Sequence, residues 1–150
     1  MEYKKITKFT KIILDIMFFC GIVVLITVPV WMKLVEKYYS DVIKTHYWMM
    51  IIIFISAGIN GVIIIGELRK MMKTVLEQNC FVQNNVHSLR IMGKLSILIS
   101  AVFCVKVFFV PTPATLIIIL VFFIAALFSI VLSCVFQEAI NYKKENDLTI

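Results

Sequence analysis

Residues 67–94 read ELRKMMKTVLEQNCFVQNNVHSLRIMGK, and this polar connector sets the organisation of the whole chain. It is the one long stretch in which charged, amide and apolar side chains are well mixed, and two apolar segments lie on each side of it. If each apolar segment crosses a membrane, the connector and both chain ends share one side of that membrane. The stretch therefore predicts a four-span protein whose most distinctive water-facing surface is the connector.

The composition argues against an ordinary soluble domain. The 150 residues are 61% hydrophobic and 16% charged, and the mean hydropathy is +0.98. Runs of about 20 apolar residues have the length that crosses the hydrocarbon core of a bilayer. The net charge of +6 comes from Lys and Arg beside these runs. In that position basic residues orient helices and contact anionic lipid head groups, so we expect membrane lipids rather than nucleic acid as partners.

We predict an all-α fold, a single domain formed by a bundle of four transmembrane helices with a helical connector. The N-terminus carries four lysines against Glu2, which places it in the cytoplasm by the positive-inside rule, and an even number of spans returns the C-terminus to the same side. The expected protein is a multi-pass protein of a bacterial cell membrane. The predicted spans are residues 12–35, 47–66, 91–110 and 114–140, with a cytoplasmic connector at 67–90 and a cytoplasmic tail at 141–150.

Several residues predict local features of these spans. Pro29 should kink the first helix, and Asp15 should pair with Lys11 one turn away. In the connector, the second helix should continue to about Gln78. Asn84 and Asn85 then have the character of an N-cap for the helix that leads into the third span.

The second span carries a small and polar face near the middle of the membrane. Ser56 and Asn60 are one turn apart, as are Ala57 and Gly61. Small residues at this spacing let two helix backbones approach closely, and an Asn side chain can hydrogen-bond across the contact. We interpret Ser56, Asn60 and Gly61 as helix-packing residues, with a ligand or ion contact at Asn60 as the alternative.

Lys106 is the one full charge well inside a predicted span. Ionisable residues within a membrane are functional candidates by default. Lys106 is close to Pro111 in the sequence, however, so we expect its stem to reach the outer interface. A pair with Asp41 or Glu36 is the alternative. The segment Pro111-Thr112-Pro113 should form a tight outer turn.

No catalytic constellation is present in the sequence. There is no Gly-rich phosphate loop, HExxH or GxSxG motif, and no CxxC pair or His spaced to complete a zinc site. We therefore expect a protein that is not an enzyme and has no cofactor and no metal. The four cysteines are best interpreted as polarisable packing residues.

The connector resembles the central segment of a family of small four-helix bacterial membrane proteins that is defined by a domain of unknown function. In that family a "pF-x-x-eN" turn precedes an "lr-ig" helix, and the chain ends in a closing motif of acidic and amide residues. Here Cys80 replaces the usual Pro and Asn84 replaces the usual acid. The matching residues are Phe81, Asn85, Leu89, Arg90, Ile91 and Gly93 in the connector and Glu138, Ala139, Glu145, Asn146, Asp147, Leu148 and Thr149 at the end.

Members of this family are commonly encoded beside a very small helix-turn-helix regulator of the XRE type. The resemblance therefore implies a membrane protein that binds and modulates its regulator, without itself binding nucleic acid. The alternative is that these motifs only cap helices and fix the inner end of the bundle. The residues that would form the contact or switch are Phe81, Asn85, Arg90, Asp147 and Leu148.

Two other classes of function remain open at this point. An immunity protein against a bacteriocin or another membrane-active agent would use the outer loop, at Tyr38, Tyr39, Asp41 and His46. A small transporter would need Asn60 and Lys106. Small-residue faces on three helices also make a homo-oligomer plausible.

Overall fold

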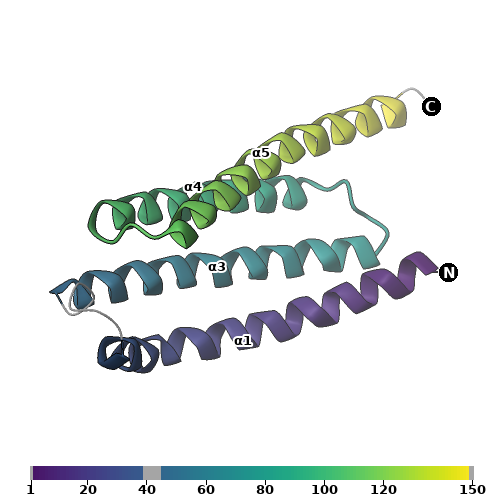
Figure 1. The fold of residues 1–150 in the computed structure, drawn as a ribbon. Helices are drawn as coiled ribbons and strands as arrows, with labels where there is room; N and C mark the ends of the chain where they lie inside the picture. The colour runs from purple at the N-terminus through teal and green to yellow at the C-terminus, as the bar shows by residue number, and fades with distance from the viewer. Residues whose placement is uncertain (1, 39–44, 149–150) are drawn as a thin grey trace.

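The computed structural model describes residues 2–38 and 45–148, and within this part the chain folds into long α-helices without strands. Each helix is long and apolar enough to cross a membrane. The predicted all-α fold of four membrane-length helices is therefore confirmed (Figure 1). The helices are α1 at Glu2–Tyr38, α3 at Tyr47–Leu76, α4 at Gln83–Phe109 and α5 at Pro113–Leu148.

The helices run back and forth, so that the start of α1, the α3–α4 connector and the end of α5 lie at one end of the molecule (Figure 1). We call this the connector end. The turn between α4 and α5 lies at the opposite end, which we call the far end. This turn is the predicted Pro111-Thr112-Pro113 segment, because α4 ends at Phe109 and α5 begins at Pro113.

The helices extend beyond the predicted spans. The helix predicted from residue 12 begins at Glu2, and α5 continues to Leu148 through most of the predicted tail. Hydropathy detects only the part of a helix that crosses the hydrocarbon core, whereas the backbone hydrogen bonds continue into polar sequence. In contrast, α3 ends at Leu76, slightly before the predicted limit, and Gln78 follows with a positive φ of 58°.

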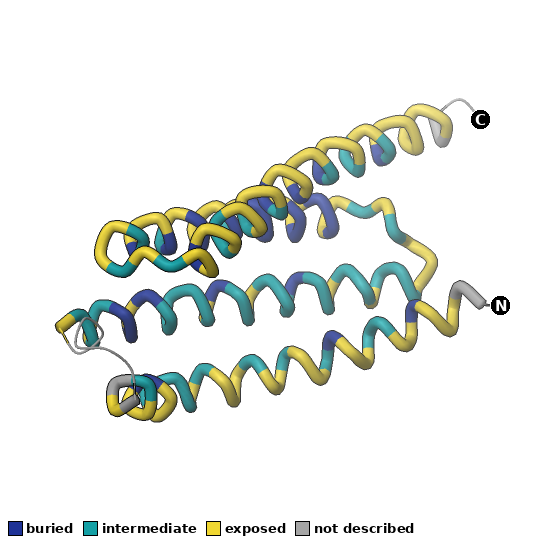
Figure 2. The backbone as a smooth tube through the Cα atoms, viewed as in Figure 1, coloured by how far each residue is buried: buried dark blue, intermediate teal, exposed yellow. Residues whose placement is uncertain are grey.

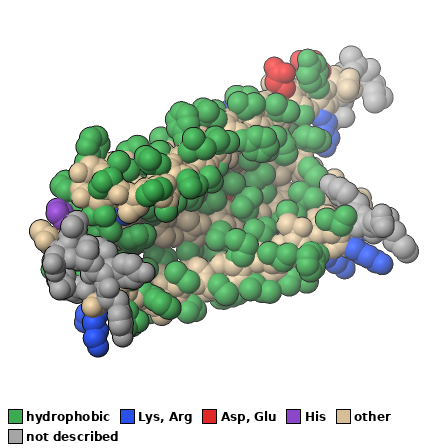
Figure 3. Space-filling view, in the orientation of Figure 1, with side chains coloured by type: hydrophobic (Ala, Val, Ile, Leu, Met, Phe, Trp, Pro, Cys, Tyr) green, Lys and Arg blue, Asp and Glu red, His purple; other side chains and the backbone are tan. Residues whose placement is uncertain are grey.

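Helices that are neighbours in the chain are also neighbours in space. Within the described residues α1 packs against α3, α3 against α4, and α4 against α5. Figure 2 shows that α4 carries many of the buried positions, whereas α1 is largely exposed. Exposed apolar side chains cover the helices between the two ends (Figure 3). Such a surface suits lipid rather than water as the surrounding solvent.

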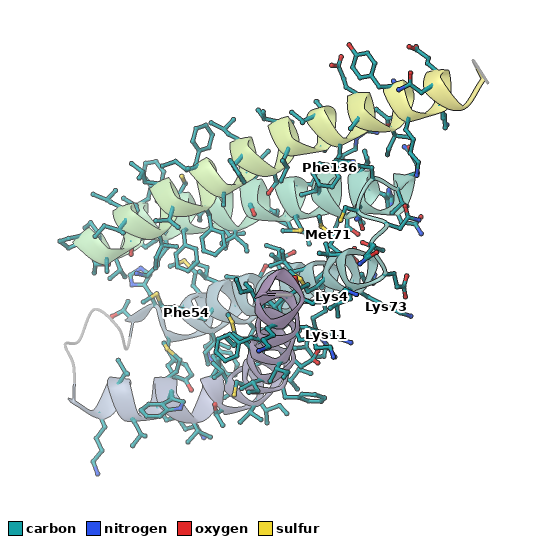
Figure 4. All side chains as sticks on the ribbon, turned by 90° about the vertical axis from the view of Figure 1, so that its right-hand side faces the viewer. Lys4, Lys11, Phe54, Met71, Lys73 and Phe136 are labelled. Atoms are coloured by element: carbon teal, nitrogen blue, oxygen red, sulfur yellow. The ribbon has the colours of Figure 1, made fainter. Side chains whose placement is uncertain are left out.

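The last part of α1 bends away from the rest of the helix, and the bend is visible in Figures 1 and 4. Pro29 lies inside this helix, where it removes a backbone donor and clashes with the preceding turn. Beyond Pro29, the side chain of Met32 is buried against Met50 and Ile51 of α3. The kinked end of α1 is thus held by apolar packing.

Helices α4 and α5 approach each other closely at Gly93. A Cβ atom on Gly93 would lie 2.8 Å from Cγ1 of Ile130 and 3.4 Å from the carbonyl oxygen of Ala126. Ser100 adds a cross-helix hydrogen bond, because its hydroxyl donates to the Ile119 carbonyl over 3.2 Å. Small residues therefore bring the two backbones together.

The α1–α3 contact differs from the predicted one. A Cβ atom on Gly58 would lie 2.6 Å from Cδ2 of Leu25, whereas a Cβ atom on Gly61 would meet nothing within 4 Å. The close approach therefore occurs at Gly58 rather than at Gly61. The amide of Asn60 also differs from expectation, since it donates to the Ser56 carbonyl of its own helix over 2.7 Å.

Candidate functional site at the connector end

Asn85 holds the turn between α3 and α4. It is 2% exposed, and its side-chain amide donates to the Thr74 hydroxyl and to the Cys80 carbonyl, each over 2.7 Å. One side chain thus joins the end of α3, the turn and the start of α4. The predicted N-cap role is not observed, because α4 begins at Gln83 and its cap position is Val82.

A buried carboxylate makes a second link between the same helices. Glu67 of α3 is 7% exposed. One carboxylate oxygen accepts a hydrogen bond from Ser88 of α4 over 2.6 Å, and the other accepts one from Lys70 over 2.6 Å. A buried carboxylate is stable only when its oxygens are paired in this way. The polar contacts of Glu67 therefore constrain the register of α3 against α4.

Asp15 links α1 to α3. Its carboxylate accepts a hydrogen bond from Nε of Arg69 over 2.5 Å, and the Arg69 guanidinium also lies over the ring of Phe18, 4.5 Å from the centroid. The sequence pattern favoured Lys11 as the partner of Asp15. The observed partner instead lies on the neighbouring helix, at the level where α1 and α3 enter the connector end.

The α4–α5 pair is linked at the same end. The side-chain amide of Gln83 donates to Gln137 over 2.9 Å, and Gln137 in turn donates to Asn141 over 3.3 Å. The ring of Phe81 lies against that of Phe136, with centroids 5.2 Å apart. The start of α4 therefore contacts α5 through an amide pair and an aromatic pair.

These contacts share one property. At the connector end each pair of neighbouring helices is joined by at least one hydrogen bond between side chains. No buried side-chain nitrogen or oxygen in the described part of the chain lacks a hydrogen-bond partner. Networks of this kind specify one arrangement of the elements they join. A shift of one helix would therefore disturb the connector.

The residues predicted to contact the regulator differ in how exposed they are. Arg90 is exposed, and Phe81 is 48% exposed while its ring rests on Phe136. Asn85 is buried in the turn. Asp147 and Leu148 are in the last turn of α5, but their side chains lie outside the described residues. The structure thus brings Phe81 next to α5 and leaves the Arg90 side chain exposed.

The connector residues that match the family motif also differ in their structural roles. Leu89 is 3% exposed and Gly93 packs on α5, so both serve helix packing. Arg90 and His87 are exposed and lie three residues apart on α4, which places them on one helix face. We call Phe81, His87 and Arg90 the connector surface.

Sequence reasoning missed Glu67, Thr74 and Ser88 as site residues. Each is an ordinary helical polar residue, and Glu67 stands beside basic residues in the pattern of a solvated helix end. Their positions on the two arms of a helical hairpin could have indicated that they meet. Residues at similar distances before and after the turn face one another, and Thr74 and Asn85 are close to the turn while Glu67 and Ser88 are further from it.

The far end holds the other predicted candidates. Lys106 is 6% exposed, and its ammonium donates to the hydroxyls of Thr115 over 2.6 Å and Thr112 over 3.4 Å. The ammonium reaches the far-end turn, but it is buried there, because Thr112 of the turn and Thr115 of α5 supply two hydroxyls beside it. The alternative pair with Glu36 or Asp41 lies outside the described residues, because the side chain of Glu36 and the whole of Asp41 are not among them.

The outer-loop residues of the immunity hypothesis are only partly described. His46 lies against Phe109, with ring centroids 5.5 Å apart. Tyr39, Asp41 and the side chain of Tyr38 lie outside the described residues. Over residues 2–38 and 45–148, no group of three His, Cys, Asp or Glu side chains is placed to hold a metal ion.

The chain matches a known protein family. Residues 37–150 match the model of a family described as a protein of unknown function, DUF2975. Because this match covers well over half of the chain, the chain belongs to that family, which confirms the resemblance found in the connector and the closing motif. No curated protein and no solved structure matches the chain. The matched region contains the whole of α3, α4 and α5.

Proposed function

We propose that this member of the DUF2975 family is a non-enzymatic protein of the bacterial cell membrane that binds and modulates a small cytoplasmic DNA-binding regulator. The binding site is the connector end. The observation that carries the proposal is the set of side-chain hydrogen bonds that joins every pair of neighbouring helices at that end. Such a set makes the connector surface responsive to how the membrane helices pack.

The distribution of charge supports a cytoplasmic connector end. The start of α1 carries Lys4, Lys5 and Lys8, all of them exposed, and the connector adds Arg69, Lys70 and further basic residues. An excess of Lys and Arg next to membrane spans marks the cytoplasmic side. With both helix ends and the connector on that side, a soluble regulator has direct access to them.

The connector surface has the chemistry of a protein interface. Arginine and aromatic side chains are enriched at protein interfaces, where they often contribute most of the binding energy. Here Arg90 and His87 are exposed on one face of α4, and Phe81 is half exposed beside Phe136. A partner with an acidic and apolar face fits this surface. The basic, DNA-binding face of a regulator would remain outside the contact.

The end of α5 supplies a second part of the surface. Glu138 and Glu145 are exposed on the segment of α5 at the connector end, where acidic side chains appear in red in Figure 3. Together with Asn141 and Tyr142 they line a polar cleft of about 190 Å³. The acidic cleft and the cationic Arg90 of the connector surface carry opposite charge, which favours one orientation of a bound partner.

The mechanism follows from the links between helices. A change in lipid state, a bound peptide or a membrane potential alters the packing of α1 and α5, which are the outer helices of the row. The hydrogen bonds at Asp15 and Gln137 carry that change to α3 and α4. Two packing states that differ in affinity for the regulator would then capture or release it.

The test is co-purification from the native host in mild detergent. Arg90→Glu combined with His87→Ala changes the connector surface without touching a buried residue. Lys33→Glu is the matched control, because Lys33 is an exposed cation on α1 beyond Pro29, towards the far end. We expect a small DNA-binding protein to accompany the wild type and the control but not the double variant. A wild-type preparation without such a protein, in cells that express both, contradicts the proposal.

A further inference from the structure

The α1–α3 seam contains a basic cleft at the connector end. Four basic side chains, Lys11 of α1 and Arg69, Lys70 and Lys73 of α3, line a cleft of about 470 Å³ together with Asp15. Figure 4 looks onto this end of the molecule and labels Lys11 and Lys73. The cleft therefore holds more positive than negative charge, on two helices that meet at the membrane boundary.

Two of these cations already form ion pairs with carboxylates. Arg69 pairs with Asp15 over 2.5 Å, and Lys70 pairs with Glu67 over 2.6 Å. The ammonium groups of Lys11 and Lys73 form no ion pair or side-chain hydrogen bond with the described part of the chain. Two unpaired cations in one cleft are complementary to a phosphate group, which can accept hydrogen bonds from both.

An apolar cleft continues the same seam into the membrane. It has a volume of about 320 Å³ and is lined by Leu25 of α1 and Phe54, Gly61 and Val62 of α3, among other apolar residues. Gly66 lines the basic cleft and is four residues, or about one helical turn, from Val62. The basic and apolar clefts are therefore adjacent along one groove.

The groove is open where a side chain would ordinarily fill it. A Cβ atom on Gly61 would meet nothing within 4 Å, although the same seam is closely packed at Gly58 against Leu25. From Gly66 to Phe54, α3 advances twelve residues, about 18 Å at the ordinary helical rise. That length is close to half of the hydrocarbon core, about 15 Å. The apolar cleft is thus long enough to hold one acyl chain of a lipid in one leaflet.

We propose that the α1–α3 seam binds an anionic phospholipid of the leaflet at the connector end. Its phosphate lies between Lys11 and Lys73, next to Arg69, and one acyl chain lies in the apolar cleft beside Gly61. The charge of the basic cleft selects an anionic head group, and the adjoining apolar cleft selects a lipid rather than a soluble anion. None of its lining residues belongs to the connector surface, so lipid binding and regulator binding can be tested with separate variants.

The proposal is tested by native mass spectrometry of the purified full-length protein in detergent, titrated with phosphatidylglycerol or phosphatidylcholine of identical acyl chains. We expect one phosphatidylglycerol to bind the wild type at least about 10-fold more tightly than phosphatidylcholine. Lys11→Gln combined with Lys73→Gln should weaken phosphatidylglycerol binding roughly 30-fold, because each basic residue near an anionic lipid contributes to affinity. The control Lys33→Gln combined with Lys143→Gln removes two exposed cations elsewhere and should bind like the wild type.

A second pair of variants tests the acyl-chain part of the site. Gly61→Phe should block the apolar cleft and abolish tight binding, whereas Gly61→Ala adds one methyl group to open space and should retain it. Circular dichroism and gel filtration confirm that both variants fold. Equal affinity for the two lipids, equal losses in the seam and control variants, or unaltered binding by Gly61→Phe would overturn the proposal. Displacement of phosphatidylglycerol by millimolar phosphate would also overturn it, because the cleft would then bind a soluble anion. A protein of doubled mass that Gly61→Phe prevents from forming would overturn it too, because the cleft would then bind a second copy of the chain.

Discussion

The carboxylate of Glu67 in α3 accepts a hydrogen bond from the hydroxyl of Ser88 in α4 over 2.6 Å, and both residues are buried. This pair lies on the membrane side of the connector, deeper than the Thr74–Asn85 bond that closes the turn. Together the two bonds hold α3 and α4 in one register at the end where we place the regulator.

Ser88→Ala should destabilise the protein measurably. A hydrogen bond to a charged group contributes about 1.5–3 kcal/mol, and its loss leaves one oxygen of a buried carboxylate without this donor. Thermal unfolding in detergent, compared with Glu77→Ala as an exposed control at the end of α3, measures the effect. A Ser88→Ala midpoint equal to that of the control would show that the Glu67–Ser88 bond contributes no stability.

Asn85→Ala should loosen the turn, because it removes the donor to both Thr74 and Cys80. We expect a loss of about 1–3 kcal/mol in the free energy of unfolding, the typical cost of leaving buried polar groups unpaired. Hydrogen exchange of the amides at residues 77–85 should become faster. The neighbouring exposed Asn84 offers the control, since Asn84→Ala should stay within about 0.5 kcal/mol of the wild type. Equal effects of the two substitutions would argue against the assigned role.

Glycines on α3 and α4 should respond in opposite ways to an added side chain. Gly93→Val forces atoms into the space of Ile130 and should destabilise the α4–α5 contact by about 1–3 kcal/mol. Gly61→Ala meets open space and should stabilise α3 by up to about 1 kcal/mol, the difference in helix propensity. Melting temperatures of the two variants in the same detergent provide the comparison. Similar shifts in both would contradict the packing described for these helices.

Lys106 and Thr115 should behave as a coupled pair. Thr115→Val removes the closer acceptor of the buried ammonium and should cost about 1.5–3 kcal/mol. Lys106→Met combined with Thr115→Val removes both partners and should recover most of that loss, since an apolar pair of similar shape can replace a buried polar one. Unfolding of the wild type, Thr115→Val, Lys106→Met and the double variant in parallel gives the coupling energy. A double variant that is less stable than Thr115→Val would contradict this interpretation.

Hydropathy and charge were sufficient to predict four membrane-length helices and the far-end turn at Pro111-Thr112-Pro113. They could not predict which polar residues meet. Asp15 has a local candidate partner in Lys11, yet the neighbouring helix places Arg69 closer to its carboxylate. Interhelical partners depend on the rotation and register of each helix, and a single sequence does not contain these directly.

The candidate site illustrates the same limit. Phe81, Asn85 and Arg90 were selected together from one motif, but the structure leaves Arg90 exposed and buries Asn85. Glu67 was overlooked because a glutamate beside lysines has the pattern of a solvated helix end, and its burial depends on Ser88 of another helix. A motif identifies positions that matter for a family, whereas burial decides whether each position contacts a partner or supports the fold.

The most direct test of the proposed function is site-specific photo-crosslinking in the native host. A photoreactive amino acid replaces Arg90 on the connector surface in one strain and Lys33 on α1 beyond Pro29 in another. We expect position 90, and not position 33, to form an adduct whose second component is a small DNA-binding protein by mass spectrometry. An adduct formed only from position 33, or none from position 90 while the regulator is expressed, would contradict regulator binding at the connector end.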